Sequence, residues 1–222
     1  MDQPGIAPDV HHGALQGLSR INRFSGTVGA IWKPIAETQQ RLGRPLRVLD
    51  VACGGGDLAI SLARRGSRRG VPLEVAGCDL SDVAIDYARQ NAARQAVAAN
   101  FFRADVLAQP LPAGYDVICS SLFLHHLETD DAANLLRGMH AAGPQLILIS
   151  DLLRTRLGYV LAWTGCRVLT RNRLCRIDGP LSVRAAFRVA EVVDLVAQCG
   201  LSGARVEKRW PERFLLVWEA SP

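Results

Sequence analysis

The chain lacks several features that would place it in particular classes of protein. Its longest apolar stretch, near residues 157–165, is far shorter than the roughly 20 residues that a membrane-spanning helix needs. Its six cysteines form no C-x-x-C pair and have no metal-ligand spacing, so reduced, partly buried thiols and no metal are expected. The first residues have neither the basic nor the apolar region of a signal peptide. These absences predict a cytoplasmic protein.

Lysine is also scarce, since only Lys33 and Lys208 occur among the 26 basic residues. A bias to arginine, with abundant alanine, leucine and valine, is typical of coding composition. The net charge of +5 therefore does not by itself indicate a nucleic-acid partner. The length of 222 residues, with 49% hydrophobic and 21% charged residues, predicts one soluble globular domain with a full core.

Residues 47–59 predict a strand, a tight turn and a helix in succession. The aliphatic run 47–52 is typical of a buried parallel strand, and three consecutive glycines follow, 54–56. A helical pattern then runs from 58 to 63 and is expected to stop at Gly66. Such a unit is the nucleotide half-site of an α/β fold, because glycines permit a tight turn and let a ligand contact bare peptide.

Two carboxylates indicate which cofactor would bind at this turn. Gly54-x-Gly56-x-x-Ala59 formally fits the dinucleotide fingerprint. However, Asp50 ends the predicted strand and Asp57 opens the helix, and these acids would repel a pyrophosphate. S-adenosylmethionine (SAM) has no phosphate and carries an ammonium and a sulfonium, which carboxylates suit. A glycine turn without any ligand is the third alternative.

The segment Leu49-Asp50-Val51-Ala52-Cys53-Gly54-Gly55-Gly56 resembles the first motif of class I SAM-dependent methyltransferases. That motif has glycine where this chain has Ala52, and an alanine predicts a negative φ there. The resemblance runs from about Arg47 to Asp151 and is closest to bacterial enzymes that act on quinones, phenols and polyketides. It implies SAM as cofactor. It also implies an α/β fold with a doubly wound, mostly parallel seven-stranded sheet and helices on both faces.

Acids also end the second and third predicted strands. Asp79 closes the strand 73–79, where an acid reaches ribose hydroxyls, and Ser81 then caps a helix. Asp105 lies at the end of a third strand, 101–106, and the resemblance implies that its carboxylate accepts from the adenine amino group. The predicted cofactor-binding residues are Asp50, Ala52, Cys53, Gly54, Gly55, Gly56, Asp57, Asp79, Leu80, Asp105, Val106, Ser120 and Ser121.

Two histidines follow the fourth predicted strand, 115–121. A phenolic acceptor usually needs a base, and histidine suits that role at neutral pH. His125 and His126 are therefore the candidate catalytic residues. The alternative for each is that it packs structurally or only shapes the pocket. Thr129 is expected to cap the helix that follows.

Residues before the first strand divide into two parts. Residues 1–12 have no periodicity and predict a disordered N-terminus. Residues 13–42 predict one or two helices with a break at Gly26. These helices either pack on the sheet edge or form a cap over the cofactor, with Asn22 and Arg23 facing the site.

Residues 152–181 predict an insertion or lid after the fifth strand, 145–150. Its apolar stretch includes Trp163, and its flanks carry Arg154, Arg156, Arg167, Arg171, Arg173 and Arg176, with no acid between Asp151 and Asp178. An apolar surface rimmed by arginine suits a greasy anionic acceptor or a transient contact with an anionic membrane. The alternative is a lid helix with snorkelling arginines. Because the segment follows the fifth strand, it should overhang the sheet edge and form part of the acceptor pocket.

The C-terminal part predicts a short helix capped by Ser182, a last helix at 189–199 and two strands, 204–210 and 214–218. The predicted function is transfer of a methyl group from SAM to an oxygen or carbon of a small apolar or aromatic acceptor. One alternative is an RNA methyltransferase that uses the arginines of 154–176. It ranks lower, because no separate nucleic-acid module is visible and no nucleic-acid partner is expected. The other is a SAM- or dinucleotide-binding module without catalysis.

Overall fold

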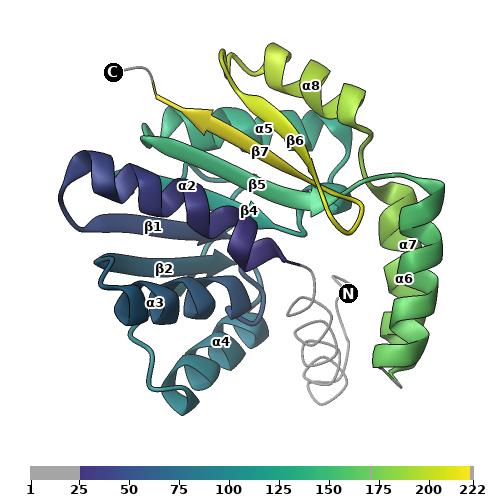
Figure 1. Cartoon of the computed structure of the whole chain (residues 1–222), viewed down its shortest axis with the longest axis horizontal. Coiled ribbons are helices and arrows are strands. Elements are labelled where there is room, and N and C mark those ends of the chain that lie inside the picture. The colour runs from purple at the N-terminus through teal and green to yellow at the C-terminus, as the bar shows by residue number, and fades with distance from the viewer. Residues whose placement is uncertain (1–25, 171, 221–222) are drawn as a thin grey trace.

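The computed structural model describes residues 26–170 and 172–220, which form a seven-stranded sheet in the order β3-β2-β1-β4-β5-β7-β6 (Figure 1). The first five strands are parallel, and β7 runs antiparallel between β5 and β6. The strands are β1 (Leu46–Val51), β2 (Leu73–Asp79), β3 (Asn100–Arg103), β4 (Val117–Ser121), β5 (Leu146–Leu152), β6 (Arg205–Arg209) and β7 (Arg213–Glu219). The predicted doubly wound α/β fold is confirmed.

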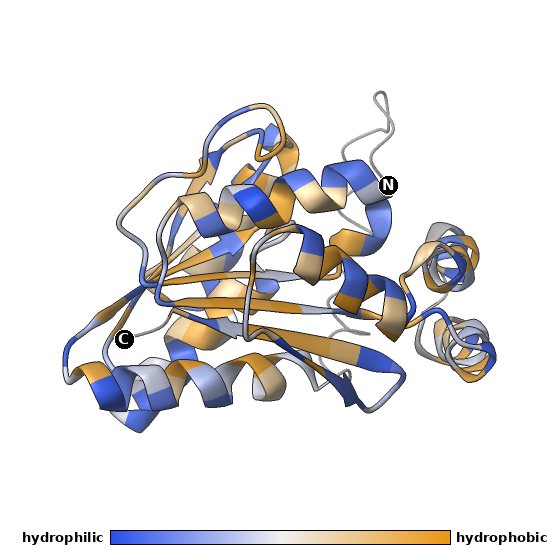
Figure 2. Ribbon diagram, turned by 90° about the horizontal axis from the view of Figure 1, so that it is seen from above, coloured by the Kyte–Doolittle hydropathy of each residue, from blue (hydrophilic) through white to orange (hydrophobic). Residues whose placement is uncertain are grey.

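Helices cover both faces of the sheet (Figure 2). One core lies under α2 (Thr27–Leu42), α3 (Asp57–Arg69) and α4 (Asp82–Arg94). The other lies under α5 (Thr129–Ala141) and α8 (Val189–Gln198). The central strands are apolar on both sides because both sides are covered, as is usual for parallel strands. Helices α6 (Arg156–Leu169) and α7 (Arg173–Ala185) form a pair beside the sheet, at the end where the parallel strands finish (Figure 1).

Helix α2 packs on a face of the sheet. Its residues Ile31, Trp32 and Ile35 are buried in the core that α3 and α4 share. This part of the predicted cap therefore has a structural role, whereas residues 1–25, including Asn22 and Arg23, lie outside the described residues. None of the described helices is long and apolar enough to span a bilayer.

Several predicted boundaries are wrong. Helix α3 continues through Gly66 and ends at Arg69, with Gly70 as its C-cap. Gly66 serves packing and not a helix end, since a Cβ there would lie 2.7 Å from the Val71 carbonyl. Ser182 does not cap a helix, since it lies inside α7. Thr129 is the first residue of α5, whose N-cap is Glu128. Helix ends of this kind depend on packing that the local pattern does not contain.

Candidate cofactor and catalytic site

The loop between β1 and α3 turns through three residues in the left-handed region. Ala52 has a φ of 55°, Gly54 of 51° and Gly56 of 76°. The prediction of a negative φ at Ala52 is therefore wrong. The chain must turn directly after β1, and this turn imposes a conformation that costs an alanine about 1–2 kcal/mol. Gly56 has a second constraint, because a Cβ there would lie 2.9 Å from the ring of Phe101.

Asp79 holds this loop from the neighbouring strand. Its Oδ2 accepts a hydrogen bond from the backbone N–H of Gly54 at 2.8 Å, and its Oδ1 accepts one from the N–H of Ser81 at 2.9 Å. Each carboxylate oxygen can accept more than one bond, so both can also accept from hydroxyl groups of a ligand. The structure thus brings Asp79 into direct contact with the glycine loop.

Asp50 is a buried carboxylate without a counter-charge. Its side chain is 1% exposed, and neither oxygen has a hydrogen-bond partner among the described residues. Burial raises its pKa to about 8, and the charges of Asp79 and Asp57 also raise it. The backbone N–H of Ala59 lowers the pKa, although it does not form a hydrogen bond with either oxygen. A buried unpaired acid is costly, and a nearby cation would relieve that cost. The charge pattern therefore fits the cation of SAM and not a pyrophosphate.

Asp105 lies two residues beyond the end of β3 and starts a turn. Its Oδ1 accepts from the N–H groups of Leu107 and Ala108, each at 3.1 Å. The prediction that β3 extends to residue 106 is wrong, because β3 ends at Arg103, opposite Asp79, the last residue of β2. The N–H of Ala104 still donates to the carbonyl of Asp79 at 3.0 Å. That bond draws the loop after β3 to the end of β2, beside the glycine loop.

The remaining predicted cofactor residues lie along the same edge of the sheet, because β3, β2, β1 and β4 are neighbours in that order. Ser120 is buried and its hydroxyl donates to the carbonyl of Val51 at 2.9 Å, which ties β4 to β1. Leu80 is 57% exposed. Gly55 and Gly56 are buried. The partly buried residues are Ala52, Cys53, Gly54, Asp57, Val106 and Ser121.

A histidine–aspartate pair lies where β4 and β5 end. Leu122 has a φ of 56°, so the chain turns sharply after β4 into a short 3-10 helix, η1 (Leu124–His126). This turn places His125 against Asp151: Nδ1 lies 2.6 Å from Oδ1, and the His125 backbone N–H donates to Oδ2 at 3.3 Å. Both side chains are buried, and no described residue bonds the other ring nitrogen, Nε2.

Electrostatics favour the charged form of this pair. Burial alone would lower the pKa of His125, but the charge of Asp151 and their hydrogen bond raise it, Asp178 of α7 adds to the rise, and Arg213 opposes it. Burial likewise opposes ionisation of Asp151, but His125 and nearby backbone N–H groups hold its pKa below the ordinary value. Asp151 thus orients the imidazole and stabilises its protonated form.

His126 has a different environment. It is exposed, and its ring centroid lies 4.2 Å from that of His125. The structure therefore joins a buried acid to His125, the buried member of the two. Asp151 and Asp178 are not among the predicted site residues. Asp151 could have been found, because it follows a buried aliphatic run at the same sheet edge as Asp50 and Asp79.

Helix α7 packs against η1 and so borders the histidine–aspartate pair. Arg173 is exposed on α7, whereas Arg171 lies outside the described residues. The role of segment 152–181 in an acceptor pocket stays a prediction. In the described part of the chain, no group of histidine, cysteine, aspartate or glutamate side chains is arranged to hold a metal ion.

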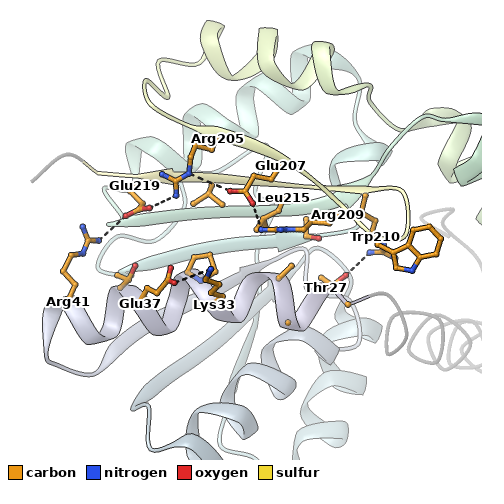
Figure 3. Close-up of a pocket in the computed structure, with 18 residues that line it drawn as sticks. Thr27, Lys33, Glu37, Arg41, Arg205, Glu207, Arg209, Trp210, Leu215 and Glu219 are labelled. Atoms are coloured by element: carbon orange, nitrogen blue, oxygen red, sulfur yellow. Dashed lines mark hydrogen bonds and ion pairs between the residues drawn. The ribbon is translucent and has the colours of Figure 1, made fainter.

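A separate hollow of about 570 Å³ lies between α2 and the β6–β7 hairpin (Figure 3). Ion pairs line it, including Arg205 with Glu219 and Lys33 with Glu37. On its floor the buried Arg213 donates to the hydroxyl of Thr27 at 2.9 Å, and burial lowers its pKa to about 10. None of the predicted cofactor or catalytic residues lines this hollow, so it is separate from the candidate site.

Comparisons with known proteins agree with this geometry. A family model described as "Methyltransferase domain" matches residues 48–142. An uncharacterized methyltransferase of Mycobacterium tuberculosis is 33% identical over 179 residues, covering 78% of this chain and 86% of the relative. The chain belongs to the methyltransferases. It is an enzyme of the SAM-dependent, Rossmann-like class, and SAM is its cofactor.

Two further similarities are weaker, the first in coverage and the second in sequence identity. The ubiquinone biosynthesis O-methyltransferase of Pseudomonas aeruginosa is 29% identical over 128 residues, which cover 55% of this methyltransferase and 51% of that enzyme. The solved structure of the plantazolicin methyltransferase BpumL with S-adenosylhomocysteine superposes with a TM-score of 0.67 at 15% identity, covering 94% of this chain and 90% of that one. At that identity the second similarity shows the fold alone.

Proposed function

We propose that this methyltransferase transfers a methyl group from SAM to a hydroxyl oxygen of a small aromatic acceptor, of the phenol or quinone-precursor type. The buried pair of His125 and Asp151 carries this proposal. An oxygen nucleophile must lose a proton when it is methylated, and an oriented imidazole is a suitable acceptor of that proton. The similarity to an enzyme named for O-methylation in ubiquinone biosynthesis supports the same acceptor class.

The residues at the glycine loop would hold the cofactor. SAM supplies a methyl group on a positively charged sulfur. The negative charge of Asp50 would neutralise that end of the site, while Asp79 would accept hydrogen bonds from the ribose and Asp105 from the adenine amino group. The left-handed turns at Gly54 and Gly56 keep side chains away from the loop, so a ligand can lie against the backbone.

His125 would act as the general base through Nε2. Nδ1 donates its proton to Asp151, which leaves Nε2 to accept the acceptor's hydroxyl proton. The resulting imidazolium lies beside the Asp151 carboxylate, and this contact stabilises it. His126, which is exposed, would shape the pocket near the acceptor. The free state of all six cysteines fits a reducing compartment, so we also propose a cytoplasmic location.

Methyl transfer to a panel of phenols, catechols and quinone precursors, detected by mass, tests the proposal. His125→Ala should lower kcat by about 10²- to 10⁴-fold, the usual contribution of a general base, with little change in SAM affinity. His126→Ala is the matched control and should retain most of the activity. Methylation at carbon, or full activity of the His125 variant, would contradict the proposal.

A further inference from the structure

The positive charge of this methyltransferase is concentrated in one segment. Residues 154–188 carry eight arginines and a single acid, Asp178, whereas the rest of the chain carries 18 basic and 20 acidic residues. Without this segment the protein would be slightly acidic. The segment comprises α6, α7 and their flanks, which stand together at one side of the molecule (Figure 1).

The same two helices expose most of the large apolar side chains found at the surface. Of the twelve exposed large hydrophobic residues in the described part of the chain, seven lie on α6 and α7: Leu157, Tyr159, Val160, Trp163, Val168, Ile177 and Leu181. Val168 is 77% exposed and Val160 57%. Single exposed hydrophobic residues are ordinary, but their concentration on one pair of helices indicates an interaction surface.

Arginines and apolar residues share one face of each helix. At helical spacing, the exposed residues of α6 include the stripe Arg156, Val160, Trp163 and Arg167, and those of α7 the stripe Arg173, Ile177, Leu181 and Arg184. Each stripe has apolar side chains in its middle and an arginine at both ends. The guanidinium of Arg167 lies over the ring of Trp163, 3.8 Å from its centroid. The solvent-facing side of each helix thus carries both arginines and apolar groups. The other sides pack on each other, and α7 also packs on η1.

The two stripes meet at a basic hollow of about 490 Å³. It is lined by residues from the start of α6 and the end of α7, including Arg156, Val160 and Arg184, with Arg188 from the start of α8. Arg154 pairs with Glu191, but Arg156 and Arg184 form no ion pair with any described residue. The helices therefore present a face on which exposed apolar groups lie beside arginines, of which Arg156 and Arg184 form no ion pair with a described residue.

We propose that this α6–α7 face docks on an anionic membrane surface. Helices with apolar side chains flanked by arginines lie in the lipid interface, where the apolar groups enter the acyl boundary and the arginines contact lipid phosphates. The positive charge of the segment disfavours association of two copies of this chain through this face, because the two faces would repel each other. A nucleic acid would attract the arginines, but it would leave Val160, Ile177 and Leu181 without an apolar partner.

This docking would act alongside the proposed methyl transfer and does not depend on it. Helix α7 packs on η1, which carries His125, and Asp178 of α7 contributes to the electrostatics of that residue. A membrane-bound face would thus lie next to the candidate base. A lipid-soluble acceptor could then reach the site without crossing bulk water.

Flotation of the full chain with vesicles tests the proposal without SAM or acceptor. Vesicles of phosphatidylcholine alone are compared with an equal mixture of phosphatidylcholine and phosphatidylglycerol, at low and high salt. We expect binding to the anionic vesicles only, weakened by salt. The triple variant Arg156→Gln, Arg173→Gln and Arg184→Gln should lower the partition coefficient by about a hundredfold, at roughly fivefold for each arginine.

A matched triple variant on another surface shows whether binding depends on this face or only on the net charge of the protein. Arg64→Gln, Arg68→Gln and Arg69→Gln remove the same charge from exposed positions of α3 and should leave binding nearly unchanged. Equal losses in both triple variants would overturn the proposal. So would absence of vesicle binding, a dimer that dissociates in the first variant, or an RNA complex that forms in preference to anionic vesicles.

Tryptophan quenching by brominated lipid locates the contact. Trp163 is 45% exposed on α6 and Trp210 is 74% exposed in the β6–β7 turn. Quenching should be lost in Trp163→Phe and kept in Trp210→Phe. The reverse result would place a different face on the membrane and overturn the assignment. Since methyl transfer is not measured, failure here leaves the proposed function untouched.

Discussion

Nδ1 of His125 lies 2.6 Å from Oδ1 of Asp151, between two side chains that are 6% and 1% exposed. The contact joins the segment that follows β4 to the end of the neighbouring parallel strand, β5. A buried acid beside a histidine fixes the orientation of the ring and favours its protonated form. The arrangement of the two strand ends therefore affects the pH range in which His125 can accept a proton.

Asp151→Asn tests this link through the pH dependence of turnover. A base must be neutral to act, so kcat should rise with pH through the pKa of His125. Because Asp151 raises that pKa, its replacement should shift the inflection to lower pH and reduce kcat by about tenfold or more. SAM affinity by titration calorimetry should stay level. An unchanged inflection would mean that His125 does not titrate in the rate-limiting step.

Asp50 should make SAM binding depend on pH. Its folded pKa of about 8 means that the carboxylate becomes charged only as the pH approaches that value. A cationic ligand favours the charged form, so affinity should increase with pH up to about 8 and then level off. Asp50→Asn should flatten this profile. Proton release on binding, measured in buffers of different ionisation enthalpy, checks the same point.

The same residue should affect stability without the cofactor. The pKa of Asp50 is raised from about 3.9 in the unfolded chain, so the folded state binds the proton more tightly. Protonated Asp50 therefore stabilises the folded state below about pH 4, and this stabilisation is lost as the pH rises toward about 8. Urea unfolding across this range should show a steeper loss for the wild type than for Asp50→Asn; parallel curves would contradict the assignment.

Asp79→Ala should weaken SAM binding by about ten- to a hundredfold, because it removes a charged hydrogen-bond acceptor and the contact that holds Gly54. Titration calorimetry measures the affinity. Asp82→Ala, at an exposed position in the first turn of α4, is the control and should bind normally. If both variants bind SAM equally well, Asp79 does not contact the cofactor.

Ala52→Gly should stabilise the protein by about 1 kcal/mol. Glycine adopts a φ of 55° without the clash that alanine suffers, although it also gains freedom in the unfolded chain. Ala63→Gly, inside α3, is the matched control and should destabilise by a similar amount. Urea denaturation compares both. A less stable Ala52→Gly variant would show that the alanine side chain contributes more than the strain costs.

The sequence alone determined the α/β fold class and the location of the glycine loop. Aliphatic runs ending in acids, and glycines 54–56, are local signals, because buried parallel strands and tight turns constrain the residues that form them. It did not determine where helices end: Gly66 lies within α3 because of a contact with Val71, which no helical pattern contains. Nor did it determine the sign of φ at Ala52, which the geometry of the turn imposes against the residue's own preference.

Only the tertiary structure decided which of the two histidines is buried against Asp151. His125 and His126 are adjacent and have the same local sequence context, so no periodicity separates them. The left-handed turn at Leu122 and the pairing of β4 with β5 bring Asp151, 26 residues away, to His125. Likewise, Arg156 and Arg184 are far apart in the chain, and they line one hollow because α6 and α7 pack side by side. Long-range contacts of this kind depend on how the whole sheet assembles, which is why local pattern could not predict them.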